Sequence, residues 1–384
     1  MASQLRVLQV IDSLARAGAE QSLTALAAPL ASEGIEVHVA YLVERDGLRP
    51  DLEKAGIPVH SLADGSSRRR WLRDTARLIK ELQPGVVHTT LFEADLAGRR
   101  AAARLGVPCV SSLVNTAYGP TEVSADRLSR IKVLAAHATD AFTARKVTRF
   151  HALTRHVATV MGRRLRIPAD RIEVIPRGRD AGHLGRRSAA RRAATRGELG
   201  IAENTPMVLA VGRQEPQKGL DVLLRAIPAV RDRFQGVRVF IAGREGRASG
   251  SLRALASKND LARTVWFLGE RDDVPELMAA ADVLAFPSLW EGAGGTLQEA
   301  MALECPIVTS ALLTILETVD ESMAVLATPG RPDELARGLV AALSDPDDSH
   351  KRVLAARARF ERDFTIDVCA PRMADLYSRV AATA

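Results

Sequence analysis

Residues 207–226 read MVLAVGRQEPQKGLDVLLRA and combine a strand, a turn and a helix. MVLAV is an unbroken apolar run, which is typical of a strand buried on both faces. Gly212 and Gly219 bound a polar loop, after which apolar residues recur at helical spacing from Leu220. A buried strand that leads directly into an amphipathic helix predicts half of a βαβ unit, whose next strand runs parallel to the first.

Similar apolar runs recur along the whole chain, most of them rich in Val and Ile and bounded by Gly or Pro. We expect strands at 5–11, 35–43, 85–90, 107–114 and 172–176, and then at 207–212, 237–243, 264–269, 282–288, 306–310 and 324–328. Helical patterns such as 20–34 and 219–234 separate them. The alternation predicts an α/β fold of two doubly wound, Rossmann-like domains, with ligands beyond the carboxyl ends of the strands.

The stretch 177–200 interrupts this alternation, because it has many arginines and no strand signal. We therefore expect a linker here and a domain boundary, which gives an N-terminal domain of residues 1–177 and a C-terminal domain of residues 178–365. Two such domains facing each other would form a cleft.

Composition and charge limit the classes of protein to consider. Of the 384 residues, 47% are hydrophobic and 26% charged, as in globular proteins, and no apolar run is long enough for a membrane span. The N-terminus resembles a first strand and not a signal peptide, and the three cysteines are far apart, so a cytoplasmic location is expected. The net charge of +7 suits anionic ligands, whereas the 4% of aromatic residues argues against nucleic acid.

The loop 212–219 contains two cations between a strand end and a helix start. Arg213 and Lys218, which follow Gly212, suit a diphosphate, because Arg offers a bidentate fork and Lys a point charge beside the helix amides. The alternative is a solvated loop with two surface cations. The order of residues excludes a Walker A loop.

A second loop, within 286–308, places two carboxylates around a run of small residues. Glu291 precedes Ala293 and Gly294, and a helix predicted to begin at Thr296 carries Glu299. Small residues and free amides at a helix start attract anions. The carboxylates could be ligand-binding groups or simply a loop charge and a helix surface residue. No His or Asp stands at a spacing that favours a metal site.

The chain resembles the retaining family-4 glycosyltransferases, which have the two-domain GT-B fold. The resemblance rests on AGAEQSL (17–23), VGRQEPQKGLDVLL (211–224), FLGERDDVPELMAAADVLAFPS (267–288) and EGAGGTLQEAMA (291–302). It implies transfer of a sugar, with retention, from a nucleoside diphosphate sugar, with a UDP-sugar favoured. It also implies no metal and no other cofactor, and an acceptor that is a small molecule or a lipid-linked glycan.

The resemblance also implies roles for individual residues. Arg213 and Lys218 would bind the diphosphate and stabilise the leaving group, Glu291 would hold the transferred sugar and Glu299 the ribose. The remaining donor contacts would come from small residues and backbone amides of Gly18, Gly212, Ala293, Gly294, Thr296 and Leu297. The C-terminal helix, about 366–384, would pack back onto the N-terminal domain.

Several positions depart from the family pattern. Leu313 and Thr314 replace a glycine pair expected near the sugar, Glu304 precedes Cys305 where the family has Cys-Gly, and Arg177 replaces a hinge Asn. Asn115 stands where many members have His; we expect it and His88 on the acceptor side. These departures keep two alternatives open: a relative that performs phosphorolysis or epimerisation, and a non-catalytic protein that binds sugar nucleotides.

The helix predicted at 68–82 is basic and amphipathic. Leu72, Ala76 and Ile79 would share an apolar face, with arginines on another. A basic face can contact an anionic membrane, so peripheral contact at the inner membrane surface is one interpretation. The other, which we favour, is an ordinary helix whose cations face water.

Overall fold

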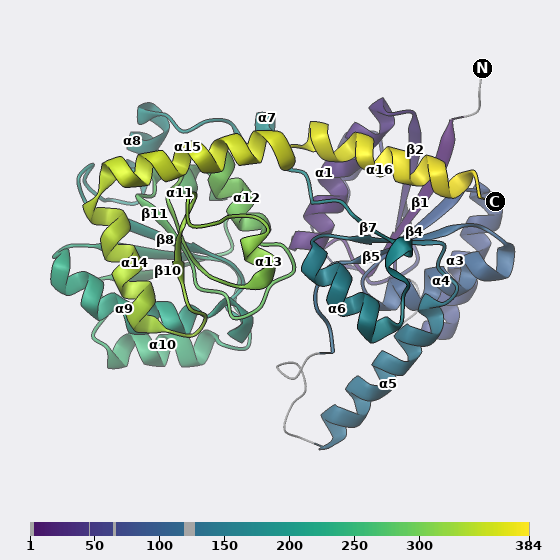
Figure 1. The fold of residues 1–384 in the computed structure, drawn as a ribbon, viewed down its shortest axis with the longest axis horizontal. Helices are drawn as coiled ribbons and strands as arrows, with labels where there is room; N and C mark the ends of the chain where they lie inside the picture. The colour runs from purple at the N-terminus through teal and green to yellow at the C-terminus, as the bar shows by residue number, and fades with distance from the viewer. Residues whose placement is uncertain (1–3, 46, 64–66, 119–126, 384) are drawn as a thin grey trace. The chain divides into compact units, whose positions relative to one another are not determined.

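The computed structural model describes residues 4–45, 47–63, 67–118 and 127–383, which divide into two compact units (Figure 1). The first unit comprises Met1–Asp180 and Phe364–Ala384, and the second comprises Ala181–Asp363. The two crossing segments bond to each other, since Arg179 N donates to Phe364 O (2.9 Å) and Ile366 N donates to Arg179 O (3.0 Å). The crossings lie a few residues from the boundaries expected at 177 and 365.

In its described residues, the first unit has one parallel sheet of seven strands in the order β3-β2-β1-β4-β5-β6-β7. The strands are β1 (Leu5–Ile11), β2 (Ile35–Tyr41), β3 (Val59–Ser61), β4 (Val86–Thr90), β5 (Cys109–Leu113), β6 (Arg149–Ala152) and β7 (Ile172–Val174). The helices are α1 (Gly18–Ser32), α2 (Arg49–Lys54), α3 (Arg68–Leu82), α4 (Phe92–Leu105), α5 (Arg127–Ala144), α6 (Arg155–Leu165) and α16 (Ile366–Ala381), with a short 3₁₀ turn at Ala169–Arg171.

In its described residues, the second unit has a parallel sheet of six strands in the order β10-β9-β8-β11-β12-β13. The strands are β8 (Met207–Val211), β9 (Arg238–Ala242), β10 (Val265–Gly269), β11 (Val283–Phe286), β12 (Ile307–Ser310) and β13 (Val325–Ala327). The helices are α7 (Ala181–Leu184), α8 (Ala189–Glu198), α9 (Leu220–Arg233), α10 (Ser249–Lys258), α11 (Val274–Ala280), α12 (Gly295–Ala302), α13 (Leu313–Leu316), α14 (Pro332–Ser344) and α15 (Pro346–Asp363), with a 3₁₀ turn at Pro216–Lys218.

These sheets confirm the predicted α/β fold with two Rossmann-like units. A strand forms within each of the predicted runs. The strands β3 and β6 were not expected, because β3 has only three residues and β6, Arg-Phe-His-Ala, alternates polar and apolar side chains instead of forming an apolar run. Both gain their place by pairing with a buried neighbour, β2 and β5 respectively.

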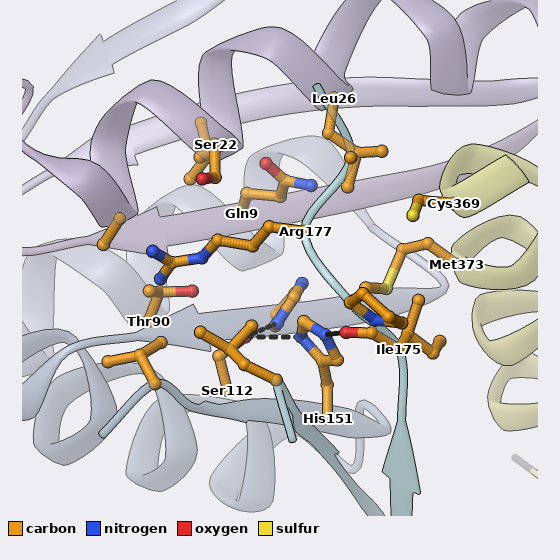
Figure 2. Close-up of a pocket in the computed structure, with 17 residues that line it drawn as sticks. Gln9, Ser22, Leu26, Thr90, Ser112, His151, Ile175, Arg177, Cys369 and Met373 are labelled. Carbon is orange, nitrogen blue, oxygen red and sulfur yellow. Dashed lines mark hydrogen bonds between the residues drawn. The ribbon is translucent and has the colours of Figure 1, made fainter. Parts of the chain in front are cut away.

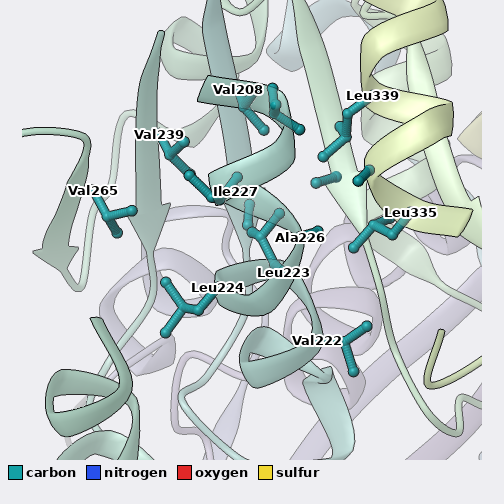
Figure 3. Packing of buried hydrophobic residues seen from close by; sticks show 14 of the residues in the cluster. Val208, Val222, Leu223, Leu224, Ala226, Ile227, Val239, Val265, Leu335 and Leu339 are labelled. Carbon is teal, nitrogen blue, oxygen red and sulfur yellow. The ribbon is translucent and has the colours of Figure 1, made fainter. Parts of the chain in front are cut away.

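The core of the second unit lies between its sheet and the helices α9 and α14. Figure 3 shows Leu223 and Ile227 of α9 packed among Val208 and Val239 of the sheet and Leu339 of α14. All five side chains are fully buried. Their burial fixes α9 against β8, so the loop between them is held at both ends.

The predicted linker 177–200 is largely wrong as a description of that stretch. After the crossing at Asp180 it forms α7 and α8, and α8 packs on α11. Two of its arginines have a structural role: Arg192 and Arg196 both bind the Asp282 carboxylate, and Arg196 is only 1% exposed. The sequence could not show this, because a run of arginines has the same composition whether the cations face water or pair with a carboxylate of the protein.

The helix predicted at 68–82 is confirmed as α3, and its buried face is wider than the predicted apolar face, whose residues all pack against the core. Trp71, Leu78 and Ile79 are buried, whereas Leu72 and Ala76 are only partly buried. The centre of the buried face, which includes Trp71, therefore lies about one residue along the helix from the centre of the predicted face. No helix in the described ranges is both long enough and apolar enough to cross a membrane.

A chain of hydrogen bonds joins α16 to the sheet of the first unit. It runs through the buried interior from β1 to the end of β7, by way of Gln9 Nε2 to Tyr377 Oη (3.1 Å), Tyr377 Oη to His88 Nδ1 (2.6 Å), His88 Nε2 to Ser112 Oγ (2.8 Å), Ser112 Oγ to His151 Nδ1 (2.9 Å) and His151 Nε2 to Ile175 O (2.8 Å).

Chemistry fixes the direction of this chain. The Ile175 carbonyl can only accept, so His151 carries its proton on Nε2 and accepts from Ser112 at Nδ1. His88 then donates to Ser112 and accepts from Tyr377. This arrangement needs both imidazoles neutral, and burial has that effect: it lowers the pKa of His88 to about 3 and that of His151 to about 4.

We predict that this chain makes the fold sensitive to acid. In the unfolded chain a histidine binds a proton below about pH 6.5, whereas buried His151 binds one only below about pH 4. As the pH is lowered through this window, the free energy of unfolding therefore falls by up to about 1.4 kcal/mol per pH unit for each histidine. His151→Gln keeps an acceptor and a donor in the chain but does not titrate. Urea midpoints measured across the window should fall less steeply in this variant.

The matched control is His350→Gln, since His350 lies exposed on α15 and should leave the pH dependence unchanged. Identical pH dependence in wild type and His151→Gln would contradict the prediction.

Candidate functional site

The two loops singled out in the sequence follow neighbouring strands of the second sheet. β8 and β11 pair in parallel, with Val208 opposite Val283 and Leu209 opposite Leu284. Their carboxyl ends therefore meet at the same edge, where loop 212–219 leads into α9 and loop 287–294 leads into α12. In the sheet, β9 lies on one side of β8 and β11 lies on the other, so the strand order reverses between β8 and β11. In open α/β sheets, ligands bind at such a point.

The two loops are joined by backbone contacts. Leu289 N donates to Gln217 O (2.8 Å), and Gln217 Nε2 donates to the Trp290 carbonyl (2.9 Å). Gly219 has a φ of +59°, and a Cβ added there would lie 2.1 Å from the Pro287 carbonyl oxygen. Only glycine therefore allows this close approach of the two loops.

Lys218 and Glu291 form an ion pair where the loops meet. Lys218 Nζ lies 2.5 Å from Glu291 Oε1, and Ser288 Oγ donates to the same oxygen at 3.0 Å. The ammonium also lies 5.4 Å from the centre of the Phe286 ring. The side chains are 19% and 9% exposed, so two residues that the sequence had assigned to different parts of a donor occupy one partly buried position.

Arg213 lies in the same loop but outside this pair. Its side chain is exposed and forms no hydrogen bond or ion pair with any residue that the structure describes. Its neighbour Glu215 pairs with Arg247 at 2.9 Å, and that hydrogen bond lowers the pKa of the Glu215 carboxyl. At the loop surface, the Arg213 guanidinium is thus unpaired among the described residues, whereas the Arg247 guanidinium is paired with Glu215.

The small-residue run is shaped by contacts that the sequence did not reveal. Gly294, with a φ of +64°, precedes α12, and a Cβ there would lie 2.7 Å from Ile315 Cδ1. The Ala293 carbonyl accepts from the buried hydroxyl of Thr318 (3.1 Å). The Leu297 amide donates back to the Gly294 carbonyl (2.8 Å), which closes the turn.

Thr296 and Glu299 complete the loop and the helix that follows. α12 begins at Gly295, one residue before the predicted start, so Thr296 lies in its first turn. Glu299 is half-buried on α12 and is not the carboxylate that pairs with Lys218. The helix places the Glu299 carboxylate about one turn beyond the amides of Gly295 and Thr296.

The loop that departs from the family pattern forms the short helix α13. Thr314 and Ile315 are buried, and Ile315 contacts Gly294, whereas Leu313 is 63% exposed. In this chain Leu313 and Thr314, at the position of the expected glycine pair, thus form part of a short helix beside the small-residue run.

The remaining candidate residues belong to the first unit. Gly18 begins α1, and its carbonyl accepts from Arg177 Nη1 (3.0 Å) and Ser22 Oγ (2.8 Å). Asn115 follows β5, and its Oδ1 accepts from the next amide, Thr116 N, at 2.8 Å. Arg177, noted in the sequence only as a departure, thus fastens the loop that carries Gly18.

His88 lies in the buried hydrogen-bond chain described above and lines a pocket of the first unit (Figure 2). About 50 Å³ of the pocket is open to the centres of water molecules. One water needs roughly 10–15 Å³ of such space, so the pocket has room for several waters. Leu26 and Met373 line it with apolar side chains, and the Arg177 side chain lies near Thr90. His88 is neutral at physiological pH and its two ring nitrogens are already bonded.

The arrangement in the second unit can neutralise an anion and hold hydroxyl groups. Lys218 and Arg213 supply positive charge, and Glu291 and Glu299 supply carboxylates beside a helix start. Sequence reasoning missed Gln217, Ser288 and Thr318, because none belongs to a charged motif; only their positions between two loops reveal them. Within the described residues, no group of three or more His, Cys, Asp or Glu side chains is placed to hold a metal ion.

Two family models match the two halves of the chain. Residues 16–183 match the model described as Glycosyltransferase Family 4, and residues 191–359 match Glycosyl transferases group 1. D-inositol 3-phosphate glycosyltransferase of Xylanimonas cellulosilytica is 31% identical over 312 residues, which cover 77% of this chain and 72% of that protein.

A second relative matches less of its length. It is the GDP-mannose-dependent monoacylated alpha-(1-6)-phosphatidylinositol monomannoside mannosyltransferase of Corynebacterium glutamicum, 29% identical over 213 residues. The match covers 53% of this chain, and it spans only about half of that relative's length (55%).

The fold is also found among solved structures. HepE of Anabaena, in complex with UDP-glucose, superposes with a TM-score of 0.85 at 23% identity, covering 98% of this chain and all of that one. The order of the motifs, the two Rossmann-like units and these matches agree. The chain belongs to the group 1 glycosyltransferases of the family 4 type, with the GT-B fold.

Proposed function

We propose that this chain transfers a sugar from a nucleoside diphosphate sugar, with a UDP-sugar favoured, to a hydroxyl group of an acceptor, with retention at the anomeric carbon. The observation that carries the proposal is the Lys218–Glu291 pair, held where the loops after β8 and β11 meet. A cation and a carboxylate 2.5 Å apart suit the junction of a sugar diphosphate, where phosphate oxygens and sugar hydroxyls are neighbours.

Each group has a proposed role that follows from its chemistry. Lys218 and Arg213 stabilise the charge that develops on the departing diphosphate. Glu291, oriented by Ser288, accepts hydrogen bonds from the sugar hydroxyls, and Glu299 accepts them from the ribose. The backbone of Gly212, Ala293, Gly294 and Thr296 approaches the donor closely, and in this role the cations replace a metal ion.

The acceptor is proposed to bind to the first unit, near Gly18 and Asn115. The relatives are named for D-inositol 3-phosphate and for a phosphatidylinositol monomannoside, which supports a hydroxyl on a small polyol or on a lipid-linked glycan. Since relatives and fold neighbours are named for both GDP-mannose and UDP-glucose, the base must be determined directly.

The donor is tested by thermal shift against UDP-, GDP-, ADP- and dTDP-sugars. The true donor should raise the melting temperature in a concentration-dependent way, because it binds only the folded state. With that donor, nucleotide release only when an acceptor is present supports transfer. Interconversion of the sugar without an acceptor would instead support the epimerase alternative, and binding without any reaction the non-catalytic one.

Lys218→Ala should lower kcat/KM by about 30- to 150-fold, since one preorganised charge-stabilising group is worth about 2–3 kcal/mol in the transition state. The matched control is Lys258→Ala, which removes an exposed lysine at the end of α10 and should leave turnover unchanged. Melting curves of both variants verify folding. Unchanged turnover in a folded Lys218→Ala protein would exclude the proposed mechanism.

Glu299→Ala should weaken binding of the donor nucleotide by about 10- to 150-fold, the scale of a hydrogen bond to a charged group. The ribose assignment is tested with the matching 2′-deoxynucleotide in isothermal titration calorimetry. If Glu299 holds the 2′-hydroxyl, the losses from the variant and from the deoxynucleotide should not add. Fully additive losses would show that Glu299 acts elsewhere.

Turnover should persist after dialysis against EDTA, because positive side chains and helix amides perform the role of a metal in this proposal. The measurement is the initial rate before and after chelation, with added Mg²⁺ or Mn²⁺ as the comparison. A rate that is lost on chelation and restored by either ion would overturn the metal-independent assignment.

A further inference from the structure

Helix α5 exposes three large apolar side chains to solvent. Ile131 is 54% exposed, Leu134 is 66% exposed and Phe142 is 58% exposed. Scattered single apolar residues are normal on a protein surface, but three on one helix form a patch that suggests an interaction surface.

The three side chains lie on one face of the helix. At 100° per residue, positions 131, 134, 138 and 142 fall within a sector of about 80°, and the exposed Ala135 and Ala138 fill the gaps between the large side chains. We call Ile131, Leu134, Ala135, Ala138 and Phe142 the apolar stripe. It is about 16 Å long, at 1.5 Å per residue from Ile131 to Phe142.

The opposite face of α5 is anchored to the unit. Asp140 is buried and bonds to Arg99 of α4 (2.5 Å) and to the Tyr118 hydroxyl (2.8 Å). His137 stacks on Tyr118 and bonds to the Arg164 carbonyl of α6. These contacts fix the rotation of the helix, so the stripe faces away from the core, and Figure 1 shows α5 beside α6 at the edge of the first unit.

The surface around the stripe is positively charged. Arg130, Lys132, Arg145 and Lys146 flank it; all four are exposed and none forms an ion pair with a described residue. The one carboxylate in α5, Asp140, is buried, and the sequence of α6 contains no acid. An apolar stripe bordered by exposed cations matches the chemistry of an anionic lipid surface: acyl chains beneath acidic headgroups.

We propose that α5 docks on an anionic membrane surface, with the apolar stripe entering the headgroup region and the flanking cations contacting acidic lipids. A second copy of the chain fits the surface less well. A two-fold contact through α5 would bring the same cations together, and the described residues of α5 and α6 offer no exposed carboxylate to pair with them.

Helix α3, considered in the sequence as a membrane contact, lacks the apolar part of this pattern. Its large apolar residues Trp71 and Leu78 are buried. Some of its cations are paired within the protein: Arg70 and Arg73 lie 3.5 and 3.4 Å from Asp74. α3 therefore offers no exposed large apolar side chain for insertion.

The test is co-sedimentation of the full chain with phosphatidylcholine vesicles that do or do not contain phosphatidylglycerol. Binding should require phosphatidylglycerol and weaken at high salt. The combined variant Ile131→Ser, Leu134→Ser, Phe142→Ser should bind at least about tenfold more weakly. Leu354→Ser, which changes an exposed apolar residue on α15, and the pair Arg73→Gln, Arg77→Gln on α3 should bind like the wild type.

Two further measurements make the result decisive. Melting curves must show that the serine variant is folded, and Leu134→Trp should show a blue-shifted emission with anionic vesicles relative to the wild-type spectrum. Full binding by the serine variant, unshifted emission, or loss of binding only in the α3 variant would overturn the proposal. So would a dimer in light scattering that the serine variant dissociates, since the stripe would then be a subunit interface.

Discussion

The parallel pairing of β8 with β11 is the constraint on which the proposed donor site depends. Asp282 fixes this pairing at the amino ends of the strands: its amide donates to the Met207 carbonyl (2.9 Å), and its carboxylate accepts from the Met207 amide (2.8 Å). Arg192 and Arg196 of α8 hold the same carboxylate. Because the register is set at one edge of the sheet, the loops at the opposite edge meet in a single arrangement.

That arrangement brings opposite charges together under partial burial. Lys218 comes from the loop after β8 and Glu291 from the loop after β11, and both are mostly shielded from water. Shielding strengthens their attraction and also strengthens any competing interaction with a phosphate or a hydroxyl. Thr318, Ile315 and Gly219 hold the backbone around the pair, so the loops are organised by neutral contacts as much as by charge.

In the first unit, a buried chain of hydrogen bonds between polar side chains holds the C-terminal helix on the sheet. Five hydrogen bonds connect β1, β4, β5, β6 and the end of β7 with α16, and their single direction leaves the side-chain oxygen of Gln9 without a donor among the described residues. That oxygen belongs to a residue that lines the pocket in Figure 2. A fully directed network of this kind specifies one position for α16, which an apolar contact alone would not.

The sequence by itself determined the two sheets, most strands, the family and the candidate residues, because apolar period and short motifs are local properties. It could not determine how wide a face α3 buries, that the arginines of α8 surround Asp282, or that Lys218 pairs with Glu291. Each depends on contacts between residues far apart in the chain. A charged or polar side chain has the same sequence signature in water as in a buried pair, so only the tertiary structure decided between them.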